Sequence, residues 1–166
     1  MSKIVFLIIS ALLFVGCSSQ KEIVSKSGMF QSVSSNEVIL LSEGKDKDSC
    51  PRCGMNLTKY FKTSHAASLD NKVYQYCSIH CLQDHLYDGV SLKNPQVVDI
   101  NSLKFIGVDK AYYVVGSSVK GTMSRVSKYA FSSKEEALEF QKKYGGEVTD
   151  FYKALEVAAK DFKERR

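Results

Sequence analysis

Four cysteines and a methionine are spaced so that their sulfur atoms could meet in one metal site. The segment Cys50-Pro-Arg-Cys53-Gly-Met55 precedes a second cysteine pair, Cys77-Ser-Ile-His-Cys81. Two cysteines separated by two residues form a knuckle that points both thiolates the same way, and Pro51 and Gly54 favour the necessary turn. Thiolate and thioether sulfurs are soft ligands that suit soft metal ions. The spacing therefore indicates a soft-metal site.

Three uses of the four cysteines remain open from the spacing alone. An exported domain could join them in disulfides, two thiol pairs could close a structural zinc site, or two or three sulfurs could hold copper. If Cys77 and Cys81 lie one helical turn apart, their Cβ atoms are about 5–6 Å apart, which is wider than a disulfide needs. A disulfide between Cys50 or Cys53 and either Cys77 or Cys81 stays open. Met55 favours Cu(I), because a thioether is a poor ligand for zinc.

Three histidines and a second methionine are further candidates for ligands. Met123 sits in a polar loop, where a role in metal binding and an incidental position are both open. His65 belongs to an alternating strand and is interpreted as a hydrogen-bonded sheet histidine. His85, one turn beyond Cys81, is expected to be a peripheral ligand, and His80 is expected on another side of the same helix.

The segments around these residues predict an α+β fold of two strand-strand-helix (ββα) units followed by a C-terminal helix. In the first unit, strands at residues 64–69 and 73–76 flank Asp70-Asn71, a pair typical of a tight hairpin turn. A helix is then expected at residues 78–87, where cysteine and histidine recur every four residues. An additional short strand is expected at residues 37–41.

The second unit repeats this plan. Strands at residues 111–115 and 128–131 lead into a helix that begins with two overlapping capping boxes, Ser132 with Glu135 and Ser133 with Glu136. That helix is expected to end at Gly145-Gly146. The C-terminal helix, with Asp150 as its cap, carries apolar residues on one face, namely Phe151, Ala154, Leu155, Ala158 and Phe162.

The N-terminus predicts export and attachment to a membrane. Residues 1–16 are typical of a signal peptide, with Lys3 before an apolar run that is too short to span a bilayer. The segment Phe14-Val-Gly-Cys17 resembles the lipobox of bacterial lipoproteins, in which the cysteine carries the lipid, whereas an ordinary signal peptide needs no cysteine here. Lipidated Cys17 would begin a flexible tether at residues 17–35, and the folded metal-binding domain would occupy residues 36–166.

Charge and motif content argue against two classes of function. The formal net charge of +5 is mild, and the lysines are scattered without a basic stripe, so we expect no nucleic-acid partner. The sequence shows no nucleophile paired with a base and no Gly-rich phosphate loop, so we expect no enzymatic activity.

Taken together, the motifs resemble the NosL family, whose members are exported lipoproteins that accompany nitrous oxide reductase and bind monovalent copper for its assembly. The resemblance begins at the first cysteine motif and includes the tract around Cys81. It continues through Ala111-Tyr-Tyr-Val-Val-Gly-Ser117, Met123, Ala130-Phe131 and Tyr144-Gly-Gly146.

This resemblance implies both ligands and partners. Cys53 and Met55 match the family's copper ligands, and Met123 is a candidate third. The protein would face the periplasm on a lipid anchor, which suggests the outer membrane because Ser18 follows Cys17. It would hand Cu(I) to nitrous oxide reductase or to its membrane-bound maturation machinery.

Cys77 and His80 depart from the family's usual pattern. With them, the cysteine tract also resembles the small YHS and TRASH metal-binding modules, which combine Cys-Gly-Met with an aromatic residue followed by Cys-Ser-x-x-Cys. That second resemblance implies a zinc or heavy-metal module with a structural or sensory role. Such a module would engage Cys50, Cys53, Cys77 and Cys81 together.

Overall fold

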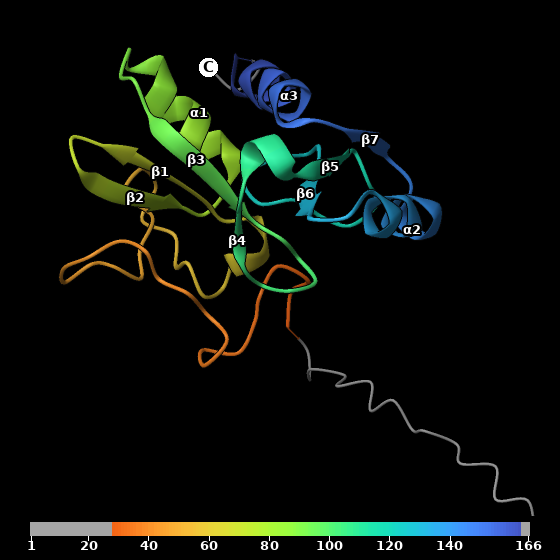
Figure 1. Ribbon diagram of the computed structural model, residues 1–166, viewed down its shortest axis with the longest axis horizontal. Helices are drawn as coiled ribbons and strands as arrows, with labels where there is room; N and C mark the ends of the chain where they lie inside the picture. Colours follow the sequence, from red (N-terminus) through yellow and green to blue (C-terminus); the bar gives the residue numbers. More distant parts are fainter. Residues whose placement is uncertain (1–27, 164–166) are drawn as a thin grey trace, which may run out of the picture.

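The hairpin predicted around Asp70-Asn71 forms the edge of the first of two antiparallel sheets (Figure 1). A computed structural model describes residues 28–163 of the chain. The hairpin strands are β1 (His65–Leu69) and β2 (Lys72–Tyr76), and both turn residues have positive φ, 48° at Asp70 and 61° at Asn71. Asn and Asp tolerate this left-handed conformation, so the pair fixes a tight turn and the register of the strands.

Two further strands complete this first sheet. Its order is β2-β1-β3-β4, with β3 at Lys93–Val98 and β4 at Phe105–Gly107. The helix α1 (Ile79–Tyr87) connects β2 to β3, as the first predicted unit requires. The sequence prediction missed β3, which contains Pro95 and has Asn94 at φ 49°, because both features are typical of turns. A register shift in the pairing of β1 with β3 accommodates them.

The second sheet has the order β6-β5-β7, with strands Tyr112–Val115 (β5), Lys128–Phe131 (β6) and Glu147–Thr149 (β7). Helix α2 (Lys134–Tyr144) joins β6 to β7. Its predicted cap is confirmed at Ser133, whose Oγ accepts a hydrogen bond from the backbone N–H of Glu136. Its predicted end is confirmed at Gly145, which has a φ of 72°.

The two units share one plan, and the predicted α+β class is confirmed. In each unit a central strand pairs with the strand that follows it and with the strand that returns after the helix, so the repeat is ββαβ rather than ββα. The returning strands β3 and β7 were not predicted. The sheets meet where the end of β3 approaches β6, through a parallel bridge between Asp99 and Ala130.

Helix α3 (Phe151–Lys163) packs against α1, and Figure 1 shows the two helices next to each other. The predicted cap is confirmed, since the Asp150 carboxylate accepts a hydrogen bond of 2.8 Å from the backbone N–H of Lys153. Ala154 and Ala158 are fully buried on the inner face. Their small side chains allow α3 to approach α1 closely, and α1 carries one half of the cysteine constellation.

The strand predicted at residues 37–41 is not formed. Its backbone is held by a side chain instead of a neighbouring strand: the Leu41 N–H donates to Gln75 Oε1 at 2.8 Å, and Gln75 Nε2 donates to the Ile39 carbonyl at 3.3 Å. Gln75 is fully buried in β2. The apolar residues 37–41 thus do not pair as a strand, because the buried amide of Gln75 bonds to the backbone at Ile39 and Leu41.

Packing extends into the segment expected to be a tether. The Phe30 ring lies 5.2 Å from that of Tyr129, centroid to centroid, and also contacts Phe140 and Tyr144. Gln31 is buried and donates to the Lys120 carbonyl. The packed part of the chain therefore begins before residue 36.

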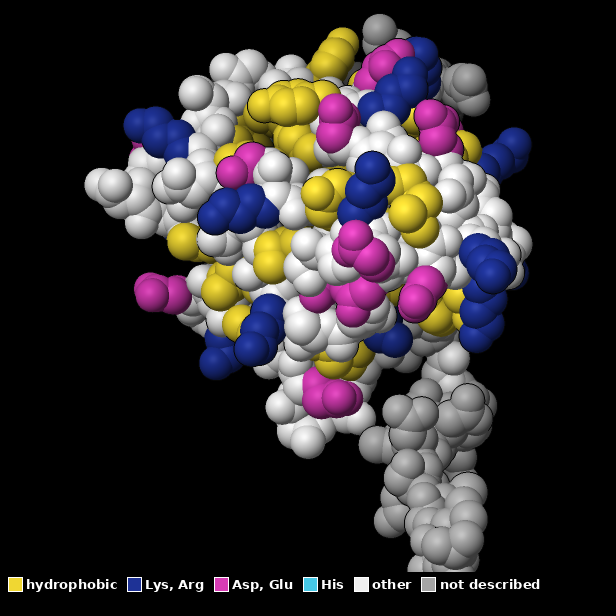
Figure 2. All heavy atoms as spheres, turned by 45° about the vertical axis from the view of Figure 1, so that its right-hand side comes forward, with side chains coloured by type: hydrophobic (Ala, Val, Ile, Leu, Met, Phe, Trp, Pro, Cys, Tyr) yellow, Lys and Arg dark blue, Asp and Glu magenta, His cyan; other side chains and the backbone are white. Residues whose placement is uncertain are grey.

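The predicted signal peptide, Cys17 and the first part of the tether lie outside the described residues. Among residues 28–163, no helix is long and apolar enough to cross a membrane. On the face drawn in Figure 2, lysine and arginine side chains are interspersed with acidic and apolar ones.

Candidate metal centre

The first two cysteines lie in a short turn with an internal hydrogen-bond pattern. The Cys50 N–H donates to the Met55 carbonyl at 2.9 Å, and the Gly54 N–H donates to the Cys50 carbonyl at 2.8 Å. A backbone bridge between Ser49 and Asn56 closes the turn at its base. Gly54 has a φ of 73°, a conformation in which a residue with a Cβ is strained. The predicted knuckle is confirmed, and it brings Met55 beside its two cysteines.

The second cysteine pair lies where β2 passes into α1. Ser78 is the N-cap of α1 and has an extended backbone, so Cys77 precedes the helix and only Cys81 lies on it. The condition that both cysteines lie on one helix is therefore not met, so the Cβ separation of about 5–6 Å expected within a helix does not apply to this pair. Their Sγ atoms are 3.7 Å apart.

The four thiols of the two motifs converge on one point. Their sulfur atoms all lie within 4.8 Å of one another, and all four cysteines are free thiols. Cys77 occupies the centre, with its Sγ 3.4 Å from that of Cys53 and 3.8 Å from the Met55 Sδ. The structure thus assembles five of the six predicted metal ligands, and it favours the two metal interpretations over disulfides.

The cluster is buried on one side and open on the other. Cys50, Cys77 and Cys81 are at most 3% exposed, whereas Cys53 is exposed and Met55 is half-buried. Hydrogen bonds from Cys77 and Cys81 lower the pKa of Cys50, while bonding to Cys50 raises the pKa of both donors. Thiols bind a metal ion as thiolates, so a bound cation would displace protons from the cluster.

An arginine between the first two cysteines holds the knuckle against α1. Arg52 forms ion pairs with Asp84 at 2.6 Å and with Asp88 at 2.7 Å, and its Nε also donates to Asp84 at 2.8 Å. These carboxylates lie four residues apart, on one face of the helix that carries Cys81. The fork of the guanidinium thus fixes the distance between the two cysteine motifs. Sequence analysis missed this contact, although the spacing of the two aspartates was a usable signal.

Met123 lies on a loop that is tied to the cluster. It is half-buried against the same core as the cysteines, and its φ of 60° is unusual for a residue with a long side chain. On one side of it, buried Thr122 and Thr63 share a hydrogen bond of 2.7 Å, and Thr63 also donates to the Cys77 carbonyl at 2.8 Å. On the other side, Ser124 donates to Asp161. Anchored neighbours therefore hold Met123 in a strained conformation, and its role as a ligand stays a prediction.

The histidines lie outside the sulfur cluster. The Nδ1 of His85 is hydrogen-bonded to the Tyr76 hydroxyl at 2.7 Å, and burial followed by the charge of Arg52 lowers the pKa of His85. His65 bonds to the Thr63 carbonyl and to the Tyr113 hydroxyl, each at 3.1 Å, and burial lowers its pKa to about 4. The interpretation of His65 as a hydrogen-bonded sheet histidine is confirmed.

His80 takes part in a buried polar network that sequence analysis missed. Its Nε2 lies 3.2 Å from the Nζ of Lys128, which in turn donates to Asp161 on α3 at 3.1 Å and to Ser124 at 2.9 Å. The network joins α1, β6, α3 and the loop of Met123. The expected orientation of His80, on another side of the helix from Cys81, fits this arrangement. The sequence offers no signal that a strand lysine and a distant aspartate would meet.

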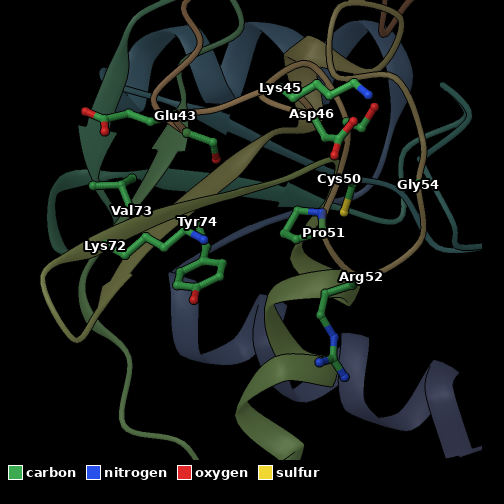
Figure 3. A pocket seen from close by; sticks show the side chains of 12 residues that line it. Glu43, Lys45, Asp46, Cys50, Pro51, Arg52, Gly54, Lys72, Val73 and Tyr74 are labelled. Carbon is green, nitrogen blue, oxygen red and sulfur yellow. The ribbon is translucent and has the colours of Figure 1, made fainter.

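A cleft of about 520 Å³ opens beside the knuckle, between the loop at residues 42–49 and β2. Figure 3 shows Cys50 and Arg52 at one wall and Lys72, Val73 and Tyr74 at the other. Charged residues of both signs line the cleft.

The fold agrees with comparisons to known proteins. The sequence pattern that defines the NosL family matches residues 42–157, so the chain belongs to this family. Among solved structures, the chain is similar to the copper chaperone NosL from Shewanella denitrificans, with 27% identity and a TM-score of 0.56. This match covers 68% of the chain and 94% of the chaperone. No curated protein matches the chain.

Proposed function

We propose that this protein binds Cu(I) through the sulfur cluster and passes the ion to a recipient protein. The observation that carries the proposal is the position of Met55, whose thioether sulfur lies 3.8 Å from Cys77 Sγ at the edge of four converging thiols. A thioether adds little to a zinc site but is a good ligand for a soft monovalent ion. Membership of the NosL family and the similarity to a copper chaperone support the same ion.

The uneven burial of the cluster suits transfer. Cys53 is exposed and Met55 is half-buried, so ligands of a recipient can replace these two while the buried thiols still hold the ion. Stepwise replacement avoids releasing free copper into water. On this account the chain acts as a carrier and performs no catalysis.

The proposed recipient is nitrous oxide reductase, or the membrane-bound machinery that matures its copper centres. Family membership supports this recipient. The proposed location is the periplasmic side of the outer membrane, with lipidated Cys17 as the anchor. The lipobox motif at residues 14–17 supports that location, and anchoring would raise the local concentration of the donor near its target.

A second candidate function is a structural or sensory zinc module. One observation favours it: Cys77 completes a set of four thiols within 4.8 Å, and four thiolates around a tetrahedral ion are typical of closed zinc sites. In such a module all four thiols would be engaged and the ion would not be transferred.

Replacing Met55 with leucine separates the two candidates. Met55→Leu keeps the volume of the side chain and removes the thioether, so we expect Cu(I) affinity to fall by about tenfold, or about 1.4 kcal/mol. Zinc affinity should stay within about twofold, because zinc gains little from a thioether. Competition against a chromophoric chelator for each metal, on the full chain in detergent, measures both affinities.

The matched control is Met29→Leu, because Met29 is an exposed methionine before the folded domain. It should leave both affinities unchanged. Equal losses of copper and zinc affinity in Met55→Leu would remove Met55 from the ligand set and favour the zinc module.

A further inference from the structure

The sulfur contacts divide the cluster into two sets that share one atom. An inner set consists of the three buried thiols, Cys50, Cys77 and Cys81, in which the Sγ atoms of Cys77 and Cys81 are 3.7 Å apart. An outer set consists of Cys53, Met55 and again Cys77, with contacts of 3.4 Å and 3.8 Å to the Cys77 Sγ. Each set offers three soft sulfurs, and only Cys77 belongs to both.

This division matters because of how Cu(I) is coordinated. Two or three sulfur ligands satisfy a monovalent copper ion, so one ion leaves part of a five-sulfur cluster unused. A thiolate has several lone pairs and can bridge two ions. Cys77 belongs to both sets of sulfurs, so its thiolate lies where a ligand that bridges two ions would have to lie.

Charge also favours two ions over one. Four thiolates around a single Cu(I) carry a net charge of −3, whereas the same thiolates around two Cu(I) ions carry −2. Three of the four thiols are buried, and uncompensated charge in a buried site is costly. The second ion lets the chain ionise every thiol of the cluster at a lower cost.

We propose that the cluster binds two Cu(I) ions, with the Cys77 thiolate as the bridge between an inner ion and an outer ion. The inference rests on the proposed copper function and deepens it. Cys50, Cys81 and Cys77 retain the inner ion, while Cys53, Met55 and Cys77 hold the outer ion at the surface. The outer ion is the one that is exchanged, and the inner ion keeps the knuckle and α1 assembled during transfer.

The test counts the ions that each variant binds. The full chain is purified in detergent without oxygen, loaded with Cu(I), and analysed by native mass spectrometry together with titration against a chromophoric Cu(I) chelator. We expect the cluster of the unaltered chain to bind two ions, and the clusters of Cys77→Ser and Cys53→Ser to bind one ion each; a single ion in the unaltered cluster would overturn the proposal. Met29→Leu should lose none, and any copper held by Cys17 is common to all the variants.

Two substitutions are needed because one of them could change the fold as well as the metal site. Cys77 is fully buried and its replacement could perturb the fold, whereas Cys53 is exposed, so Cys53→Ser tests the proposal independently. If the unaltered chain and Cys53→Ser bind the same number of ions, the two-ion proposal is overturned and the proposed function stands. If the unaltered chain binds no Cu(I), both are overturned.

Discussion

Replacing Asp161 with alanine is expected to destabilise the domain by about 3 kcal/mol, because it removes a carboxylate that pairs with the buried ammonium of Lys128. The Lys128 side chain is only 2% exposed and lies 3.1 Å from the Asp161 carboxylate. His80, with a side chain 3% exposed, lies 3.6 Å from the same oxygen. Thermal unfolding of the full chain, followed by circular dichroism, measures the loss.

Two companion variants identify the cause of that loss. Asp46→Ala, in the exposed loop before the knuckle, should have almost no effect. Adding Lys128→Met to Asp161→Ala should restore much of the stability, because an apolar side chain of similar length then replaces the buried ammonium that has lost its carboxylate. If Asp161→Ala cost no more than Asp46→Ala, the network would not support the packing of α3 on α1.

The ion pair of Asp161 with Lys128 also predicts that the stability of the domain depends on pH. Burial raises the pKa of Asp161, but hydrogen bonds from Ser124 and Lys128 and the charge of Lys128 outweigh it, so the folded-state pKa is lowered from 3.8. A lowered carboxylate pKa adds stability above the unfolded-state value, and this contribution is lost as the pH falls through the folded-state value. Between neutral pH and acid, Asp161→Asn should therefore show a smaller loss of stability than the unaltered chain.

Replacing Cys81 with serine is expected to weaken binding of the first Cu(I) ion by about a hundredfold. Structural Zn²⁺ sites with four ligands bind with about 10–16 kcal/mol, or about 3 kcal/mol for each ligand, and we expect a buried thiolate to contribute a similar amount to Cu(I) binding. Cys81 is buried beside Cys77, with 3.7 Å between their sulfurs, so its replacement removes one of the three buried thiols expected to hold the first ion. Competition with a chromophoric Cu(I) chelator measures the change.

The control for Cys81→Ser is His85→Gln, one turn further along α1. The His85 ring bonds to the Tyr76 hydroxyl and lies outside the sulfur cluster, so its replacement should change Cu(I) affinity by less than about threefold. A loss in His85→Gln as large as that in Cys81→Ser would mean that the histidine is a ligand after all.

The local features of the fold were predictable where one residue type dictates the backbone. Asp70-Asn71 set the first hairpin through their tolerance of positive φ, and Ser133 and Gly145 set the ends of α2. Strand β3 was not predictable, because Pro95 and Asn94 have local preferences that its pairing with β1 overrides. Helix α1 was predicted at residues 78–87, and it begins at Ile79 with Ser78 as its N-cap, so Cys77 precedes it.

The metal ligands of the candidate site were predicted from the sequence, whereas the contacts that hold them in place were not. Cysteine and methionine spacing identified the sulfur cluster, because few other uses explain four thiols and a thioether together. The ion pair of Lys128 and Asp161 could not be predicted from the sequence, since the two residues belong to different elements that only the folded chain brings together. The position of Met123 relative to the cluster likewise depends on tertiary structure, and its role as a ligand stays a prediction.

The most direct test of the sulfur-bound copper site is X-ray absorption at the copper edge on the full chain loaded with Cu(I). The account predicts a monovalent edge and a coordination shell made only of sulfur. Nitrogen or oxygen donors in that shell, or complete displacement of the copper by an equal amount of zinc, would contradict it.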